Sequence, residues 1–180
     1  MFKRFTPDLF VKTIYDIPLE RLREMGIRGL IFDLDNTITM HDQLEISSRA
    51  LKWFKTLKEQ GFKVCILSNN SGGRVKESAD IMGIECVSRA KKPRRQGFYR
   101  AFETLGTKPQ ETAMVGDQLF TDIWGGNRAG VFTILVEPIS SKEMWGIKYV
   151  SRNFERIIWP AVKRNLMKNP QTTVNLLEKE

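Results

Sequence analysis

The sequence predicts an α/β fold: a Rossmann-like, doubly wound parallel sheet with helices on both faces. Short runs of apolar and β-branched residues alternate with longer amphipathic segments, as strands and helices do in such folds. A glycine follows each amphipathic segment and supplies a helix stop. Polar side chains gather where the apolar runs end, and ligands of open parallel sheets bind at that edge.

The strands are predicted from apolar runs that leave no polar face. Residues 30–32 and 64–67 are continuously apolar, which is typical of strands buried on both sides. Similar but shorter runs follow later in the chain. In order, the predicted strands span residues 28–33, 62–67, 84–87, 112–115 and 131–136.

The helices are predicted from apolar residues that recur on one helical face. Between residues 47 and 60, Ala50, Phe54 and Leu57 share a face among lysines, and Gly61 ends the segment. The same pattern, each time closed by a glycine, recurs between the predicted strands. In order, the predicted helices span residues 18–25, 47–60, 73–82, 96–105 and 119–129.

Length and composition indicate one globular domain with two extensions. The chain has 180 residues, 41% of them apolar and 28% charged, which is enough for a core that folds alone. We expect a lead-in at 1–27 that packs on the domain or rests on a membrane, the main domain at 28–138, and a helical extension and tail at 139–180 with a helix near 154–166. Because no window resembles a membrane span, and because charges and Pro7 interrupt the N-terminus, a cytoplasmic protein is expected.

The net charge of +8 is concentrated in one part of the chain. A block of six cations without any acid comprises Arg89, Lys91, Lys92, Arg94, Arg95 and Arg100. Such a block predicts an anionic partner, which could be a phosphorylated substrate, an acidic lipid surface or a nucleic acid. Since the block flanks a predicted strand end, we expect it to line the mouth of the site.

Two carboxylates follow the first predicted strand of the main domain. Asp33 and Asp35 are spaced i and i+2, so in an extended chain both side chains point to the same side of the sheet. Their mutual repulsion would be offset by a divalent cation. Alternatively, the pair simply opens a turn, because Asp-Asn-Thr is good turn sequence.

Three further strand ends carry polar residues and favour an active site over a simple turn. Ser68, Asn69 and Asn70 follow the second strand, Lys92 follows the third, and 116–122 follows the fourth with two more aspartates. These strand ends are predicted to meet at the switch point of the sheet.

In combination, these residues resemble the motifs of the haloacid dehalogenase (HAD) superfamily of phosphohydrolases. Asp33 to Thr37 match the first motif, Asp-x-Asp-x-Thr, while Ser68, Lys92 and the acidic stretch 116–122 match the other three. The resemblance extends from residue 30 to about residue 136. Because the intervals between the motifs are too short for a cap domain, the chain resembles the uncapped subclass IIIA, which includes soluble phosphatidylglycerophosphate phosphatases.

The resemblance implies a role for each matching residue. Asp33 would be the nucleophile that is phosphorylated on its carboxylate, and Asp35 the acid and then the base. Ser68, Asn69 and Lys92 would bind the phosphoryl group.

The resemblance also implies Mg²⁺ as the cofactor. Its ligands would be Asp33, the main-chain carbonyl of Asp35, and Asp117. Asp122 would either support the metal site or pair with Lys92. His41, the only histidine, is either solvent-exposed or a substrate contact.

The sequence leaves three candidate functions. The first is a Mg²⁺-dependent phosphatase of phosphatidylglycerophosphate that works at the inner membrane surface, attracted by its basic block. The second is a phosphatase of a small phosphorylated metabolite. The third, a basic RNA- or ribosome-associated protein, explains the charge but not the carboxylates, and a phosphotransferase activity stays open.

Overall fold

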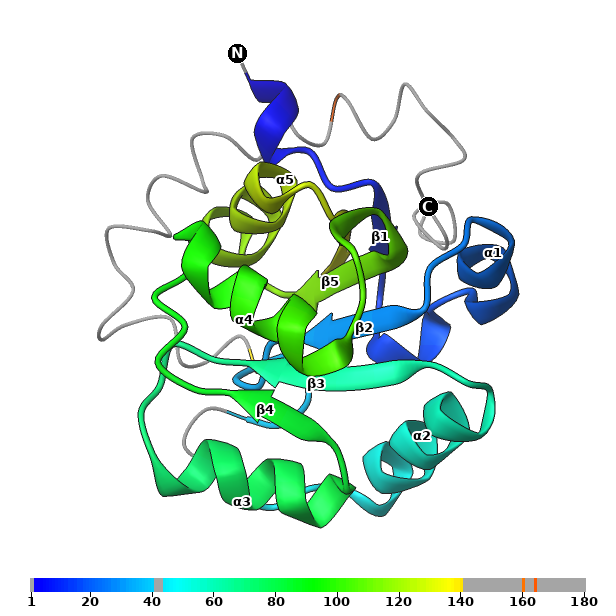
Figure 1. Cartoon of the computed structure of the whole chain (residues 1–180), viewed down its shortest axis with the longest axis vertical. Helices are drawn as coiled ribbons and strands as arrows, with labels where there is room; N and C mark the ends of the chain where they lie inside the picture. The colour runs from blue at the N-terminus through cyan, green and yellow to red at the C-terminus, as the bar shows by residue number, and fades with distance from the viewer. Residues whose placement is uncertain (1, 41–43, 141–159, 161–163, 165–180) are drawn as a thin grey trace.

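A single parallel sheet organises the chain, and the computed structural model describes residues 2–40, 44–140, 160 and 164. The six strands of the sheet run in the order β1-β6-β5-β2-β3-β4 (Figure 1). Their bounds are β1 (Leu9–Val11), β2 (Gly29–Phe32), β3 (Lys63–Leu67), β4 (Glu85–Val87), β5 (Thr112–Gly116) and β6 (Phe132–Val136). The order reverses beside β2, which lies between β5 and β3. The predicted doubly wound sheet is confirmed.

Helices cover both faces of this sheet (Figure 1). They are α1 (Leu19–Glu24), α2 (Ser48–Glu59), α3 (Gly73–Met82), α4 (Arg95–Leu105) and α5 (Gly125–Ala129). Along β2, Leu30 and Phe32 pack in the core cluster that contains Phe54 of α2. Ile31, which points the other way, packs in the cluster that contains Phe98 of α4. Burial on both faces explains why the strands are continuously apolar.

Short local signals set the helix ends close to their predicted positions. The side chain of Ser47 caps α2 by accepting a hydrogen bond from the backbone N–H of Ala50 at 3.1 Å. Gly83 ends α3 and Gly106 ends α4 in the left-handed conformation, with φ of 60° and 59°.

The N-terminal segment contributes an edge strand that the sequence analysis did not predict. Leu9–Val11 form β1, which pairs in parallel with β6, so Leu9 lies opposite Ile134. Next to this strand, the Asp8 carboxylate accepts hydrogen bonds from the backbone N–H and the hydroxyl of Thr133 at 2.8 and 3.1 Å. The segment thus packs on the domain by extending its sheet.

The helix predicted over 119–129 is divided into two segments. Its first part is the π-helical segment η4 (Leu119–Trp124), and only Gly125–Ala129 form the α-helix α5. A Cβ on Gly126 would lie 2.7 Å from Cγ2 of Thr133, so the glycine allows α5 to approach the sheet closely. π-Helical turns often occur at functional sites, and only Asp117 and Gln118 separate η4 from the end of β5.

Some predicted features lie outside the described residues. These are His41 and most of the helix expected near 154–166. Within the described ranges, no helix combines the length and the apolar character needed to cross a membrane.

Candidate active site

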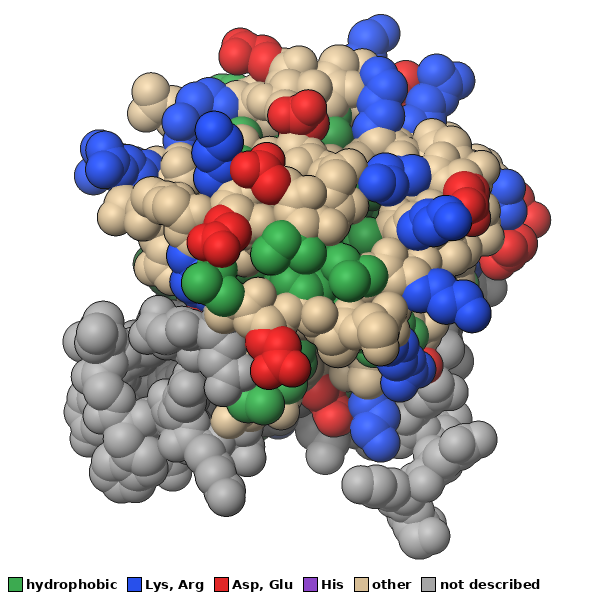
Figure 2. Space-filling model, turned by 90° about the horizontal axis from the view of Figure 1, so that it is seen from below, with side chains coloured by type: hydrophobic (Ala, Val, Ile, Leu, Met, Phe, Trp, Pro, Cys, Tyr) green, Lys and Arg blue, Asp and Glu red, His purple; other side chains and the backbone are tan. Residues whose placement is uncertain are grey.

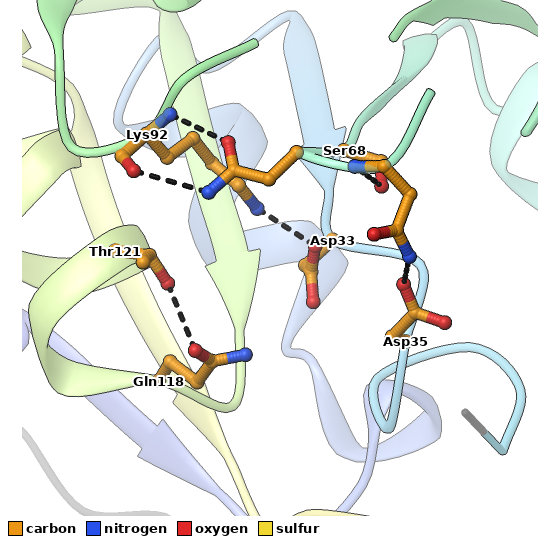
Figure 3. A pocket seen from close by; sticks show the side chains of 8 residues that line it. Asp33, Asp35, Ser68, Lys92, Gln118 and Thr121 are labelled. Carbon is orange, nitrogen blue, oxygen red and sulfur yellow. Dashed lines mark hydrogen bonds and ion pairs between the residues drawn. The ribbon is translucent and has the colours of Figure 1, made fainter. Parts of the chain in front are cut away.

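A polar pocket opens at the carboxyl ends of β2, β3 and β5 (Figure 3). It is lined by Asp33, Asp35, Ser68, Asn69, Asn70, Lys92, Gln118 and Thr121. The structure therefore brings the predicted catalytic and substrate-binding residues to one place beside β2, where the strand order reverses. Gln118 and Thr121 were not singled out in the sequence, because their contribution depends on the π-helical turn of η4.

A buried cation between two carboxylates forms the inner part of the pocket. The Lys92 ammonium lies 2.7 Å from Oδ1 of Asp33 and 2.8 Å from Oδ1 of Asp122. The three side chains are 2%, 6% and 0% exposed, respectively. Because an unpaired buried charge is costly, these three groups hold one another in place. Of the two roles expected for Asp122, the structure shows the pairing with Lys92.

Burial and neighbouring charges shift the pKa values of this inner set. Desolvation by burial raises the pKa of Asp33 to about 6, with Lys92 opposing the shift and Asp122 adding to it. Burial alone would lower the pKa of Lys92, but the carboxylates of Asp122 and Asp33 outweigh it and raise that pKa above its usual value. Lys92 therefore stays positively charged. Without a bound metal ion, Asp33 takes up a proton at a higher pH than an ordinary aspartate does.

Asn69 fixes the main chain of Lys92. Its Oδ1 accepts a hydrogen bond from the Lys92 backbone N–H at 2.6 Å, and its Nδ2 donates to the Lys92 carbonyl at 3.0 Å. Both ends of the side-chain amide are therefore engaged with the protein. This geometry gives Asn69 a positioning role. Because Asn69 also lines the pocket, the substrate contact that we expected for it stays a prediction.

The loop before Lys92 is folded tightly against the end of β3. Arg89 donates its backbone N–H to the Asn70 carbonyl at 3.0 Å, and Ala90 donates to the Ser68 carbonyl at 2.9 Å. Arg89 and Lys91 have φ of 48° and 56°, a left-handed conformation that is unfavourable for residues with a side chain. This loop thereby connects Ser68 to Lys92 and sets the spacing between them.

Asp35 lies at the outer part of the pocket with partners of its own. Its Oδ2 accepts a hydrogen bond from Nδ2 of Asn70 at 2.7 Å, and its Oδ1 forms an ion pair with Nη2 of Arg74. Asn36, with φ of 61°, turns the chain directly after it, so the turn expected from Asp-Asn-Thr is also present. Arg74 was missed by the sequence analysis, although the glycines before it place it in the first turn of a helix facing this edge.

The acidic cluster at the ends of β2 and β5 has the donor set of a hard cation. One carboxylate oxygen from each of Asp33, Asp117 and Asp122 can be chosen so that all lie within 4.8 Å of one another. Asp122 is engaged at both oxygens, since its Oδ2 accepts from the Gln118 backbone N–H at 3.1 Å. Oδ1 of Asp33 pairs with Lys92, and Oδ1 of Asp117 accepts a hydrogen bond from the Thr37 hydroxyl. These two carboxylates could hold Mg²⁺, an oxygen-seeking ion. A ligand role for the Asp35 carbonyl stays a prediction.

The basic block does not line the pocket as we expected. Lys92 alone enters it, whereas Arg89, Lys91, Arg94 and Arg95 are exposed and absent from its lining. The physical reason is the turn of the chain at residues 89–92, which directs one cation inward and leaves its neighbours in solvent.

Known proteins with similar sequences are phosphatases. A family model described as mitochondrial PGP phosphatase matches residues 2–140. The probable phosphatase YqeG of Bacillus subtilis is 42% identical over 162 residues, which cover 90% of this chain and 94% of that protein. Phosphatidylglycerophosphate phosphatase 1 of Arabidopsis thaliana is 32% identical over 173 residues, which cover 90% of this chain but only 48% of that protein. The chain thus spans about half the length of the plant relative.

Solved structures confirm the fold. A cobalt-bound deoxy-D-mannose-octulosonate 8-phosphate phosphatase from Haemophilus influenzae superposes with a TM-score of 0.52 at 18% identity, over 82% of this chain and 96% of that chain. Within the described residues, the intervals from β2 to α2 and from β3 to α3 contain only loops. The matching family model, the similar sequences and the strand-end motifs agree, and the chain belongs to the PGP phosphatase family of HAD-type phosphatases.

Proposed function

We propose that this phosphatase hydrolyses a phosphomonoester through a phosphorylated Asp33, with Mg²⁺ as cofactor. The observation that carries the proposal is the buried Asp33 carboxylate, 2.7 Å from the Lys92 ammonium and beside Asp117 in the acidic cluster. A carboxylate that attacks an anionic phosphate needs nearby positive charge. Lys92 supplies part of this charge, and Mg²⁺ between Asp33 and Asp117 would supply the rest by neutralising the phosphoryl oxygens.

The chain's own residues account for both halves of the reaction. In the first half, an Asp33 oxygen bonds to phosphorus, the bond to the leaving oxygen breaks, and Asp35 gives its proton to the departing alkoxide. In the second half, Asp35 takes a proton from a water molecule as its oxygen bonds to phosphorus, the bond between phosphorus and the Asp33 oxygen breaks, and inorganic phosphate leaves. The Lys92 ammonium and the Ser68 hydroxyl stabilise the charge on the transferring group. Asp33 returns to its ionised form.

The substrate we propose is phosphatidylglycerophosphate, at the surface of an anionic membrane. Support comes from the matching family and from relatives named for this activity. The site also suits a substrate that stays in a bilayer, because the described loops around it add no domain that would enclose a small molecule. Exposed cations at Arg94 and Arg95, at the start of α4, would favour contact with acidic headgroups.

A second candidate is a phosphatase of small phosphorylated metabolites. The pocket lining is compatible with it, because every residue that lines the pocket carries a polar group that could bind a small polar substrate. RNA binding gains no such support. On the face shown in Figure 2, many Lys and Arg side chains follow one another along the right-hand side with a few acidic ones among them, but this charge gives no reason for the carboxylates of the pocket.

A substrate panel with defined metal ions tests the proposal. With Mg²⁺, the protein should release phosphate fastest from short-chain phosphatidylglycerophosphate, compared with sugar and nucleotide phosphates. EDTA should abolish this activity and Mg²⁺ should restore it, whereas Ca²⁺ should restore little because its looser coordination misplaces the phosphoryl group. Full activity in exhaustively chelated protein would remove the metal from the proposal. Faster turnover of a soluble metabolite would favour the second candidate.

A further inference from the structure

The outer ion pair between Arg74 and Asp35 joins two elements that are far apart in sequence. Arg74 belongs to the first turn of α3, after Gly72, and its side chain reaches across to the loop that follows β2. Its side chain is 18% exposed, whereas that of Asp35 is 7% exposed and the inner Lys92 is 2% exposed. The Arg74 side chain is thus partly accessible to solvent, and its guanidinium contacts a carboxylate that lines the pocket.

The proposed mechanism indicates which part of the substrate lies near the Arg74 guanidinium. If Asp35 protonates the leaving oxygen, that oxygen must come within hydrogen-bond distance of the Asp35 carboxyl. The alcohol portion of the substrate then extends past Asp35, and Arg74 is the cation in contact with Asp35. A substituent a few bonds beyond the leaving oxygen therefore comes close to Arg74.

We infer that Arg74 selects substrates whose leaving group carries a second anion, such as the phosphodiester of phosphatidylglycerophosphate. A guanidinium presents several N–H donors in a planar fork that matches phosphate oxygens. Arg74 would turn part of this fork from Asp35 to the second anion. Asp35 would stay in position, because Asn70 holds its other oxygen at 2.7 Å. The inference rests on the proposed function and names the specificity of that same site.

Neighbouring cations are less suited to this role. Lys92 is held by two carboxylates in the inner part of the pocket. Arg100 donates its Nη2 to the carbonyls of Ser88 and Arg89 at 3.0 and 3.1 Å, away from the site. The exposed cations on either side of Lys92 are, like Arg74, absent from the pocket lining, but in the described part of the chain no ion pair joins them to one of its carboxylates. Among the described residues, Arg74 is the arginine that the structure pairs with a pocket-lining carboxylate.

Two soluble substrates separate recognition of the second anion from lipid binding. Deacylated phosphatidylglycerophosphate has a phosphomonoester and a phosphodiester, whereas glycerol 3-phosphate has the monoester alone. The wild-type protein should show a lower KM for the first. In Arg74→Gln, KM for the first should rise on the order of tenfold to a hundredfold, as expected for loss of a charge-assisted hydrogen bond. KM for glycerol 3-phosphate should change little.

Matched variants keep this test decisive. Lys76→Gln removes an exposed cation from the same helix and should preserve the preference. Arg74→Lys keeps the charge but lacks the fork, so its preference should be intermediate. Thermal melts of all three variants identify any loss of fold. Equal losses of kcat on both substrates would overturn the inference, because Arg74 would then act only by orienting Asp35.

The same assays distinguish an error in the lipid assignment from an error in the specificity role of Arg74. If the acylated lipid is not hydrolysed but the preference for the soluble two-anion substrate depends on Arg74, the lipid assignment falls and the specificity role stands. If the lipid is hydrolysed and Arg74→Gln leaves both KM values unchanged, the specificity role falls and the lipid assignment stands.

Discussion

The inner and outer parts of the site each pair a cation with a carboxylate, yet they differ in burial. Lys92 is 2% exposed between Asp33 and Asp122, whereas Arg74 is 18% exposed on Asp35. A desolvated charge that loses its partner has no water to replace it, so the inner set stays together. A partly exposed guanidinium can exchange its partner for solvent or substrate at much lower cost.

This difference separates two tasks. The inner charges suit the chemistry of phosphoryl transfer, which requires donors that are already in place when charge develops. The outer pair suits recognition, which requires a donor that can leave one anion for another. The predictions below test this division, beginning with the largest expected effect.

Replacement of the proposed nucleophile should have the largest effect. Asp33→Asn preserves size but removes the attacking carboxylate, so phosphate release from any monoester should fall below detection. The measurement is phosphate release from p-nitrophenyl phosphate beside a thermal melt that shows whether the fold survives. Asp80→Asn, an exposed aspartate on α3, is the control. Retained turnover in Asp33→Asn would exclude the covalent mechanism.

Removal of Lys92 should destabilise the folded protein more than removal of Arg74. Lys92→Met leaves two buried carboxylates without their cation and should lower the free energy of unfolding by about 3–5 kcal/mol. Arg74→Met should cost less, about 1 kcal/mol, because Arg74 is itself partly exposed and Asp35 keeps its hydrogen bond from Asn70. Urea unfolding of both variants measures the difference. Equal losses would mean that burial does not distinguish the two pairs.

The pH dependence of stability should reveal the raised pKa of Asp33. Its pKa is raised from 3.8 to about 6 in the folded protein, so the folded state binds this proton more tightly than the unfolded chain. The resulting stabilisation is fully present below pH 3.8 and is lost as the pH rises through 6, by about 3 kcal/mol in total.

This comparison requires metal-free protein and the variant Asp33→Asn. Melting temperatures between pH 4 and 7 should fall more steeply for the wild type, because the variant lacks the titrating carboxyl. Parallel curves for the two proteins would show that Lys92 fully compensates the charge of Asp33.

Changes to the exposed cations should have the smallest effect on the chemistry. In Arg94→Glu combined with Arg95→Glu, binding to acidic vesicles should weaken, since each cation near such a surface contributes about 1 kcal/mol. Added salt should weaken wild-type binding in the same way. Hydrolysis of p-nitrophenyl phosphate should change little. Equal loss of vesicle binding and soluble turnover would show that these residues support the catalytic site or the fold.

The strand-end residues were predictable because a parallel sheet converts sequence order into position. Once Leu30–Phe32 reads as a buried strand, Asp33 must lie at its carboxyl end, and the same reasoning places Ser68, Lys92 and Asp117 at the same edge. The motif pattern then implied their roles. The adjacent turn at residues 89–92 was not predictable, since its direction depends on hydrogen bonds to the residues after β3.

The missed features depend on distant partners. A strand as short as Leu9–Val11 shows no periodicity, and its pairing with β6 is visible only in the folded chain. The π-helical start of the helix after β5 coincides with a bond between Asp122 and the Gln118 backbone. Likewise, Arg74 became a site residue only through its contact with Asp35.

The pairing of β1 with β6 also constrains how the chain is completed during synthesis. Asp8 bonds to Thr133 across 125 positions of sequence, so β1 has no neighbour in the sheet until β6 has also left the ribosome. The strands β2 and β3, by contrast, can pair much earlier. Since β6 is the last strand of this sheet in the sequence, the edge that β1 forms is the last part of the sheet to assemble on the growing chain.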